Sequence, residues 1–536
     1  SSAIVNEAAK AYGIMAYGKF KNSQLDSEIT HLLINSDPEI RWRAAYALMR
    51  SGNPRFANEM LLSLKDDDYR VRMDAARALG AMGLDKTDKS LRSHVVNALL
   101  EIGSNDPDWR VRVNAMAALG NFKFLVDDLK KIYFLTAFEG KKDKDIHVRL
   151  TAIKSMAASY QNDVKNVRAF LAPFAEKHWP AMDWHEKAEF MISLTQMFGE
   201  TLIDQSMFTG WLESCLTDSN RYLRARSVTA LANIRSPKIM PILEKTLTDS
   251  FPLVQTNALD VLSTIKSERS HELLLQSLQS KNATVVAVAA GYLAEDESLK
   301  KNFDAKENLV EKIISGFKNA SVSDIESQII IFDIVGELKG SAAAVFLNTY
   351  LDDSSNVVAQ SAVKNLEKIV GEEIDNKKPH YHDVDYSALL ELKSKKPSAV
   401  IETSQGTIEI DFLMDDAPLT VMNFVKLAEM KFFDGVYFHR VVPNFVIQTG
   451  DPAGTGWGGP GYAIRSEFNQ RKYERGTVGM ASSGKDTEGS QWFITHSAQP
   501  HLDGRYTVFA KVTEGMEVVD KIQVGDRVIS VEIQKY

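Results

Sequence analysis

Through the first two thirds of the chain, apolar positions recur at a spacing that predicts helices with one buried face. In the clearest case an apolar residue, a small residue and a second apolar residue follow one another four positions apart, as Ile40, Ala44 and Leu48 do. This spacing is typical of an amphipathic helix. The frame occurs eight times, 31 to 40 residues apart with two gaps of about double length, and its anchor positions are Arg41, Arg72, Arg112, Arg149, Arg224, Gln255, Val286 and Ala359.

A short polar residue four positions before most anchors marks where each helix should begin. Its side-chain oxygen can accept the amide hydrogens that the first helical turn leaves unpaired. These residues are Asp37, Asp68, Asp108, Asp145, Asn220 and Asn282, with Phe251 and Ser355 as exceptions. Weaker copies near Lys187 and Gln328 would fill the two long gaps and give about ten repeats. Because Asp and Arg stand at fixed offsets, we also expect them to pair between neighbouring repeats as a ladder.

The repeated pattern, an Asp followed by Val-Arg-x-x-Ala-x-x-Ala-Leu-Gly, resembles the HEAT repeats. The resemblance covers roughly residues 25 to 372. It implies an all-α solenoid, which we assign to residues 1–372, whose inner helices form a protein-binding surface. Arrays with this motif also include bilin lyases of light-harvesting proteins, but nothing in this sequence singles out a bilin site.

After Gly371 the helical period stops and a strand-like period begins. Residues 373–397 are charged and are predicted to be a linker. Beyond them, alternation on both sides of Gly406 predicts a hairpin, and Asp415 is expected to cap a helix that runs to Met430. A second helix over 516–522 and a last strand over 528–533 follow. Short strands with two helices in about 140 residues favour a closed antiparallel barrel over residues 398–536.

Composition and charge exclude several classes of protein. The 536 residues carry a net charge of −8 and a pI of about 5.9, so no general positive field recruits nucleic acid. The single cysteine, Cys215, excludes a disulfide framework. The longest uncharged apolar stretch, 285–294, is too short for an integral membrane segment. Because the chain begins Ser1-Ser2 without methionine or an apolar signal, we expect a processed or trimmed chain.

Three sequence features resemble sites for other chemistry, but we assign none of them a catalytic or metal-binding role. His380 and His382 lack a third ligand nearby, so we predict no metal site. The run 454–459 matches G-x-G-x-x-G, but no helix follows it, and we predict a glycine-rich surface loop. Ser490 lacks the glycine elbow and His-Asp partners of a nucleophile.

The stretch 438–451, Phe-His-Arg-Val-Val-Pro-Asn-Phe-Val-Ile-Gln-Thr-Gly-Asp, closely resembles the signature of cyclophilin-type peptidyl-prolyl cis-trans isomerases. Further matches follow in the family's order at Gly479-Met-Ala-Ser482, Gly489-Ser-Gln-Trp-Phe-Ile494, Leu502-Asp-Gly504 and Val508-Phe509. The resemblance extends over residues 398 to 536. It implies a closed eight-stranded barrel with two helices, and rotamase activity on X-Pro bonds.

The chemistry of that reaction can be reasoned without the family. Rotation about an X-Pro amide breaks no bond, so it requires neither a nucleophile, a metal nor a cofactor. The catalyst needs a hydrogen-bond donor that binds the twisted amide better than the planar one. A planar, permanently charged guanidinium suits that role better than a lysine ammonium.

By resemblance, Arg440 is the catalytic donor and Gln448 positions it while binding the substrate backbone. The proline pocket would be lined by Phe445, Val446, Phe493 and Leu502. Residues before the proline would lie along Ala481, Ser482 and Gln491, and His501 and Tyr506 would border the pocket. Val446, Ser482, His501 and Tyr506 stand where the best-known eukaryotic members have Met, Asn, Trp and His, so we expect weak cyclosporin binding.

Two functions from different classes fit these features. The first is a modular isomerase in which the solenoid binds protein clients, as a chaperone or folding assistant would, and the barrel isomerises their prolines. The alternative is a non-catalytic scaffold whose barrel binds proline-containing peptides. The intact Arg440 and Gln448 favour the enzyme. The sequence also resembles bacterial repeat–cyclophilin fusions that are exported, which favours the periplasm or cell envelope over the cytoplasm.

Overall fold

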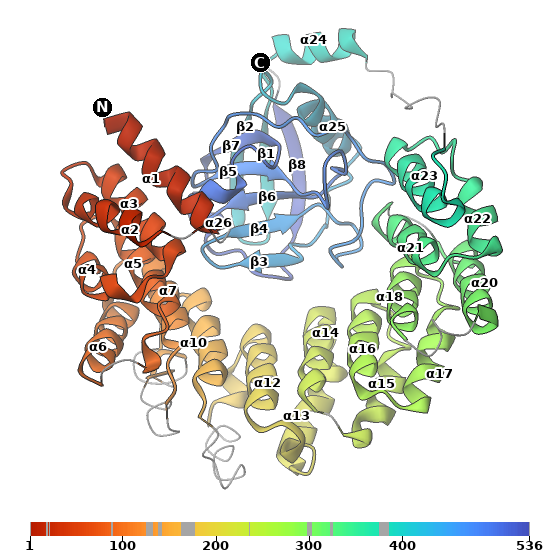
Figure 1. Cartoon of the computed structure of the whole chain (residues 1–536), viewed down its shortest axis with the longest axis horizontal. Coiled ribbons are helices and arrows are strands. Elements are labelled where there is room, and N and C mark those ends of the chain that lie inside the picture. The colour runs from red at the N-terminus through yellow and green to blue at the C-terminus, as the bar shows by residue number, and fades with distance from the viewer. Residues whose placement is uncertain are drawn as a thin grey trace. The chain divides into compact units, whose positions relative to one another are not determined.

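The chain divides into two compact units, residues 1–235 and 236–536. The computed structural model describes residues 2–17, 20, 22–86, 89–124, 132–133, 135–137, 142–161, 177–234, 236–296, 303–321, 325–374 and 385–534. The first unit is helical, and the second contains further helices and then a β-sheet (Figure 1). Among the described helices, none is both long and apolar enough to span a membrane. His380 and His382 lie outside the described residues.

In the first unit, the predicted repeat helices pack side by side in chain order (Figure 1). They are α3 (Pro38–Ser51), α5 (Tyr69–Ala81), α7 (Trp109–Leu119), α10 (Ile146–Ser159), α12 (Trp184–Phe198) and α14 (Arg221–Ala230). The other helices are α1 (Ser2–Tyr17), α2 (Ser23–Thr30), α4 (Ala57–Ser63), α6 (Lys89–Asn105), α9 (Leu135–Ala137) and α13 (Ser206–Leu216). The predicted stripe is buried: Val71, Ala75 and Leu79 have no exposed surface.

The predicted helix caps are confirmed. Asp37, Asp68, Asp108 and Asp145 each accept a hydrogen bond from the amide two residues later, at 2.8 to 2.9 Å. Asn220 and Asn282 also cap their helices, whereas Phe251 and Ser355 make no side-chain cap. The two weak repeats are helical as well: α12 begins with a capping box at Asp183, and α21 occupies the second gap.

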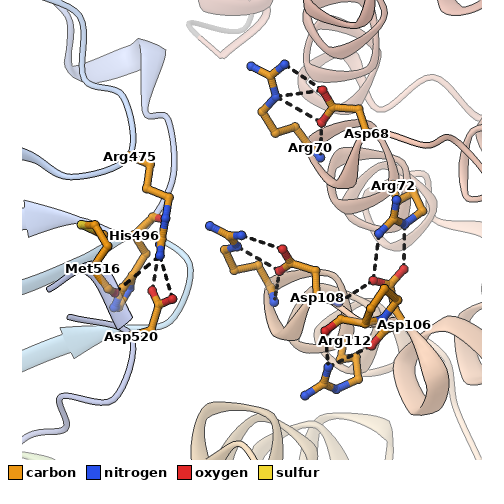
Figure 2. Close-up of polar contacts among 12 residues, drawn as sticks. Asp68, Arg70, Arg72, Asp106, Asp108, Arg112, Arg475, His496, Met516 and Asp520 are labelled. Carbon is orange, nitrogen blue, oxygen red and sulfur yellow. Dashed lines mark hydrogen bonds and ion pairs between the residues drawn. The ribbon is translucent and has the colours of Figure 1, made fainter. Parts of the chain in front are cut away.

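The predicted Arg–Asp ladder is present, and its acidic members are not the capping residues (Figure 2). Each of the first three anchor arginines forms a two-point ion pair with an aspartate two residues before the next cap, with N···O distances of 2.7 to 3.0 Å. The pairs are Arg41–Asp66, Arg72–Asp106 and Arg112–Asp143. Each arginine also donates to a main-chain carbonyl of its own loop. The ladder therefore holds each inter-repeat loop to the helix on both sides of it.

The second unit begins with the same repeat architecture. Its helices are α15 (Met240–Thr246), α16 (Pro252–Ile265), α17 (Glu268–Ser277), α18 (Ala283–Ala294), α20 (Phe303–Asn319), α21 (Ile325–Leu338), α22 (Ser341–Asn348) and α23 (Asn356–Val370). Helices α16, α18, α21 and α23 pack in that order. Part of the predicted linker is also helical, as α24 (Tyr386–Ser394), and its Leu392 packs into the core of the following sheet.

The C-terminal region forms one eight-stranded sheet, in which all neighbouring strands are antiparallel. The strands are β1 (Ser398–Thr403), β2 (Gly406–Phe412), β3 (Arg440–Val442), β4 (Val446–Thr449), β5 (Thr477–Met480), β6 (Trp492–Thr495), β7 (Val508–Glu514) and β8 (Val528–Gln534). Their order is β3-β4-β6-β5-β7-β2-β1-β8. Helix α25 (Pro418–Glu429) packs against β7 and β8 and α26 (Met516–Val519) against β2, and the core centres on the fully buried Trp492.

The predicted closed barrel is wrong, because the sheet is an open half-barrel. Strand β3 pairs with β4 and forms no ladder with β8, so the two end strands of the sheet do not join. The segment ahead of β3 meets the start of β8 instead, through main-chain hydrogen bonds such as that from Gly435 N–H to the carbonyl of Val528, and through one isolated bridge between Tyr437 and Arg527. We call residues 398–534 the half-barrel.

Two further expectations about this region are corrected. Asp415 does not cap α25; the amides of Leu419 and Thr420 donate to the carboxylate of Glu467, at 3.1 and 2.8 Å. The predicted helix over 516–522 ends at Val519. It is held to the sheet by Arg475, which donates two 2.8 Å hydrogen bonds to the Asp520 carboxylate and one to the carbonyl of His496 (Figure 2).

Candidate active site

Four strands of the half-barrel place a row of residues on one face of the sheet. Arg440 on β3 pairs with Gln448 on β4, Gln448 pairs with Phe493 on β6, and Phe493 pairs with Gly479 on β5. Directly paired residues point to the same face of a sheet. The next row, which includes Ile447, points into the main core instead. Strand register therefore brings the guanidinium of Arg440 and the ring of Phe493 to one surface.

The turn between β3 and β4 positions Phe445. Asn444 has a φ of 61°, a left-handed conformation that asparagine tolerates better than most residues. Its carbonyl accepts hydrogen bonds from Ser497 Oγ at 2.8 Å and Gln499 Nε2 at 3.0 Å. The turn thereby fixes the Phe445 ring, whose centroid is 5.6 Å from Arg440 Cζ and 5.7 Å from the centroid of a stacked His501.

Beside Phe445 lies a small apolar cluster, separate from the main core. The cluster consists of Val446, Tyr473, Phe493, Leu502 and Val508, with Phe445, Ala481 and Tyr506 packed against it. Tyr473 stacks on Phe493 with ring centroids 5.5 Å apart, and Tyr506 meets Phe493 edge-on at 6.1 Å. The cluster is therefore built on stacked aromatic rings, and the guanidinium of Arg440 lies next to it.

Glycine at position 479 makes this aromatic packing possible. A Cβ added there would lie 2.2 Å from the Tyr473 hydroxyl oxygen and 2.8 Å from Phe493 Cζ. Tyr473, Val508 and Gly479 were not among the predicted site residues. Tyr473 lies in a loop without hydrophobic periodicity, and only the fold brings it under Phe493. Gly479 and Val508 stand within the matched family motifs, and those motifs were the only sequence signal for them.

A chain of hydrogen bonds fixes the orientation of Arg440. The fully buried Asp451 accepts the amides of Thr455 and Gly456, at 2.7 and 2.6 Å, and so shapes the glycine-rich loop. The carbonyls of Gly456 and Gly458 each accept a 2.9 Å hydrogen bond from Gln491 Nε2. With its nitrogen committed to the loop, Gln491 turns its oxygen toward Gln448.

The same chain continues to the guanidinium. Gln448 Nε2 donates to Gln491 Oε1 at 3.0 Å, which leaves Gln448 Oε1 to accept from Arg440 Nη1 at 3.3 Å. The order of donors and acceptors is thus set by the carbonyls of the glycine-rich loop. This loop was predicted to be a surface feature, and the structure adds that it supports the site.

The charge of Arg440 is available to a ligand. Among the described residues, no carboxylate pairs with its guanidinium. Partial burial lowers the pKa of Arg440 below its usual value, but an arginine so far above neutrality stays protonated at pH 7. Ser490 is buried and donates to the carbonyl of Gly450 at 2.6 Å, a structural role that agrees with its rejection as a nucleophile.

All of the predicted site residues come together on this face. Arg440, Gln448, Phe445, Val446, Phe493 and Leu502 form its centre, His501 and Tyr506 its border, and Ala481, Ser482 and Gln491 line an adjoining cavity. An apolar aromatic cluster beside an oriented guanidinium that pairs with no carboxylate among the described residues suits a proline and its preceding amide. The fold and the site together define the class of peptidyl-prolyl isomerases.

Comparison with known proteins gives the same class. The family model of cyclophilin-type peptidyl-prolyl cis-trans isomerases matches residues 398–535. A HEAT repeat model matches residues 5–80 and 209–294. The chain belongs to the cyclophilin-type peptidyl-prolyl isomerase family, and its N-terminal region carries HEAT repeats.

Bacterial relatives are similar over nearly their whole length. A peptidyl-prolyl cis-trans isomerase of Synechococcus elongatus is 50% identical over 25% of this chain and 94% of its own. A peptidyl-prolyl cis-trans isomerase of Helicobacter pylori is 48% identical over 26% of this chain and 87% of its own length. Peptidyl-prolyl cis-trans isomerase B of Bacillus subtilis is 50% identical over 24% of this chain and 90% of its own length. The aligned part in each case is about a quarter of this chain, the size of the half-barrel.

Proposed function

We propose that this protein isomerises X-Pro bonds in protein clients, which its HEAT repeats bind and its half-barrel turns over. The observation that carries the catalytic part is Arg440, an unpaired guanidinium directed by Gln448 and located beside the Phe445 ring. We assign the helical part to residues 1–372, the linker to 373–397 and the isomerase domain to 398–536.

In this proposal Arg440 donates to the proline nitrogen as it becomes pyramidal and loses amide resonance. That nitrogen is a poor acceptor in the planar amide and a better one in the twisted state. The donor therefore binds the transition state more strongly than the substrate, which is the requirement for catalysis. Gln448 keeps the donor in place and accepts or donates to the backbone of the substrate.

The apolar residues hold the proline ring while the amide turns. Phe445, Val446, Phe493 and Leu502 form the pocket in this proposal, and His501 and Tyr506 close its border. Ala481, Ser482 and Gln491 guide the residues before the proline. The stacking of Tyr473 on Phe493 supports this assignment. The residues that hold the proline ring must stay in place while the preceding amide rotates.

The competing proposal is a scaffold that binds proline peptides without turning them over. The unpaired and oriented Arg440 favours the enzyme, since simple binding of an apolar ring needs no guanidinium. A protease-coupled isomerisation assay with full-length protein and short proline peptides separates the two. Turnover well above the uncatalysed rate supports the enzyme, and saturable peptide binding without acceleration supports the scaffold.

A further inference from the structure

The repeat helices of the first unit carry a second regular pattern, on the side turned away from the buried stripe. Positions two before and two, five and nine after each anchor fall on one side of a helix. With Lys187 as the anchor of α12, we call this side of α3, α5, α7, α10, α12 and α14 the cationic face. Its charged residues are Arg43, Arg50, Arg70, Arg77, Arg110, Lys154 and Arg226, against Glu39, Asp74 and Glu189. The face is therefore positive, in a chain whose net charge is −8.

Contacts between neighbouring helices confirm that these positions share one surface. Arg70 Nη1 of α5 donates to the Glu39 carboxylate of α3 at 2.6 Å. Arg226 Nη2 of α14 donates to the Glu189 carboxylate of α12, also at 2.6 Å. Arg70 and Arg110 pair in addition with the capping aspartates of their own helices. The positive charge is concentrated on α3, α5 and α7, which hold all but two of the cations.

Aromatic rings hold these arginines in place. The Cζ atoms of Arg43 and Arg70 lie 3.9 and 4.6 Å from the centroid of the Trp42 ring. The same pairing occurs twice more, as Arg50 over Tyr46 at 5.2 Å and Arg110 over Tyr69 at 4.0 Å. A guanidinium that packs over a ring keeps the N–H groups at its edge for hydrogen bonds. The rings thus orient the arginines without using their donors.

The carboxylates of the face do not use all the donors of its arginines. Arg43 is only 5% exposed and contacts Glu39 through Nε and Nη2, but its Nη1 has no hydrogen-bond partner among the described residues. Arg77 donates through Nη1 to Asp74 at 2.9 Å, and that carboxylate is itself buried. The side chains of Arg70 and Arg77 are partly exposed. A ligand with carboxylates can supply the acceptors that this face lacks.

Two observations favour an acidic protein segment over a nucleic acid. Trp42 and Tyr46 are each 2% exposed, so bases cannot stack on them as they do in proteins that bind single strands. The spacing also fits an extended peptide. Packed helices lie about 8 to 10 Å apart, and cations seven residues apart on one helix, such as Arg43 and Arg50, are about 10 Å apart along its axis. An extended chain covers about 10 Å in three residues.

We infer that the arginines of α3 and α5 bind an extended acidic segment of a client protein, with carboxylates at about every third residue. The inference rests on the proposed function, because it names the chemistry of the client that the HEAT repeats would hold. Carboxylates form charge-assisted, two-point hydrogen bonds with guanidinium groups, which selects them over neutral amides. Because the charges are partly exposed, added salt weakens the contact.

The test measures binding of labelled probes to full-length protein by fluorescence anisotropy. One probe is a proline-free peptide with glutamate at every third position, the second has glutamine there, and the third is a single-stranded oligonucleotide. We expect the glutamate peptide to bind about tenfold more tightly than the glutamine peptide or better. The advantage should shrink between about 0.01 M and about 0.15 M salt, where the Debye length falls from about 30 to about 8 Å.

Two variants and one matched control locate the binding. Arg50→Gln and Arg70→Gln should each weaken binding of the glutamate peptide about two- to fivefold, the range for a partly exposed ion pair. Arg55→Gln is the control, because it removes the same charge from an exposed residue of the turn Pro54–Phe56, outside the cationic face. It should bind as the parent does. Thermal unfolding checks the fold of each variant, and Arg50→Gln carries the test if Arg70→Gln, which also loses Glu39, is destabilised.

Three results would overturn the inference. The first is equal binding of the glutamate and glutamine peptides by the parent. The second is equal weakening by Arg55→Gln and the two face variants, which would indicate only a general attraction. The third is tighter binding of the oligonucleotide, which would assign the face to nucleic acid. Failure of the isomerase function is distinguishable, because the parent would then not accelerate a short proline peptide, whatever its binding of the acidic probe.

Discussion

A single side chain, Arg440, carries most of the proposed chemistry. Arg440→Ala should lower kcat/KM by about 100-fold or more, the loss typical of removing one donor that acts on a transition state. Most of the loss should be in kcat, because the donor binds the planar substrate weakly. The assay is protease-coupled isomerisation of a short peptide.

Arg440→Lys is the matched variant for this experiment. It keeps the charge but loses the planar fork that Gln448 orients, so we expect it to recover little activity. Near-UV circular dichroism should show that both variants retain the aromatic packing of the half-barrel. Normal turnover by a folded Arg440→Ala protein would remove Arg440 from the mechanism.

The buried histidine His496 predicts how the half-barrel responds to acid. Its Nε2 lies 3.3 Å from the carbonyl oxygen of Val519, and burial lowers the pKa of the ring to about 4. In the unfolded chain that pKa is about 6.5. Between these values the unfolded state binds the proton and the folded state does not. The free energy of unfolding should therefore fall as the pH drops from about 6.5 toward 4.

We expect this group to remove roughly 2 to 3 kcal/mol of stability between pH 7 and pH 4.5, at about 1.4 kcal/mol per pKa unit. Urea unfolding of the parent and of His496→Gln at the two pH values measures it. Glutamine keeps an amide that can bond to the Val519 carbonyl and does not titrate. If both proteins lose the same stability on acidification, other groups set the acid response.

At the scale of elements, the Arg–Asp ladder should contribute more to stability than the ion pairs at the surface. Arg112 and Asp143 are almost fully buried, and their side chains are only 6% and 8% exposed. Arg112→Ala would leave a buried aspartate without its partner, which typically costs about 3 to 5 kcal/mol. Thermal or urea unfolding monitored by helical circular dichroism should show the loss.

Lys368→Ala is the control for that experiment. Its ion pair with Glu337 also joins neighbouring repeats, at 2.7 Å, but the two side chains are 35% and 72% exposed. Pairs of this kind contribute about 0 to 1 kcal/mol. Equal destabilisation by the two substitutions would mean that the ladder has no special role.

At the scale of the whole molecule, the proposal predicts that joining the two activities improves turnover of protein clients. A client held on the helical repeats would meet the half-barrel at an effective concentration that can approach millimolar. The full chain should therefore accelerate proline-limited refolding more than an equimolar mixture of fragments 2–374 and 385–536. The full chain should show a lower apparent KM for the client than the mixture does. Its kcat should be unchanged, because the catalytic step at Arg440 is the same.

Helix α24 decides where the isomerase fragment must begin. A fragment that began at Pro397 would lose α24, whose Leu392 is part of the half-barrel core, so the isomerase fragment starts at Asp385. Equal refolding by the mixture, for a client that the repeats demonstrably bind, would contradict delivery. The repeats would then be an anchor to a fixed partner.

The sequence by itself determined the features that depend on nearby residues. The repeat helices follow from apolar spacing within eight residues, and their caps from contacts between residues two positions apart. The ladder could be predicted from fixed offsets, although the choice of Asp66 over Asp68 as the partner of Arg41 could not. The candidate site residues could be proposed from the sequence because the motifs around Arg440 and Gln491 are long and ordered.

Tertiary structure alone decided the features made by residues far apart in the chain. Glu467 replaces Asp415 at the start of α25, and β3 and β8 form no ladder, because both outcomes depend on which segments meet. Tyr473 supports Phe493 only once β5 and β6 are paired. Local periodicity contains no information about contacts across such distances, since they are fixed by packing of the whole unit.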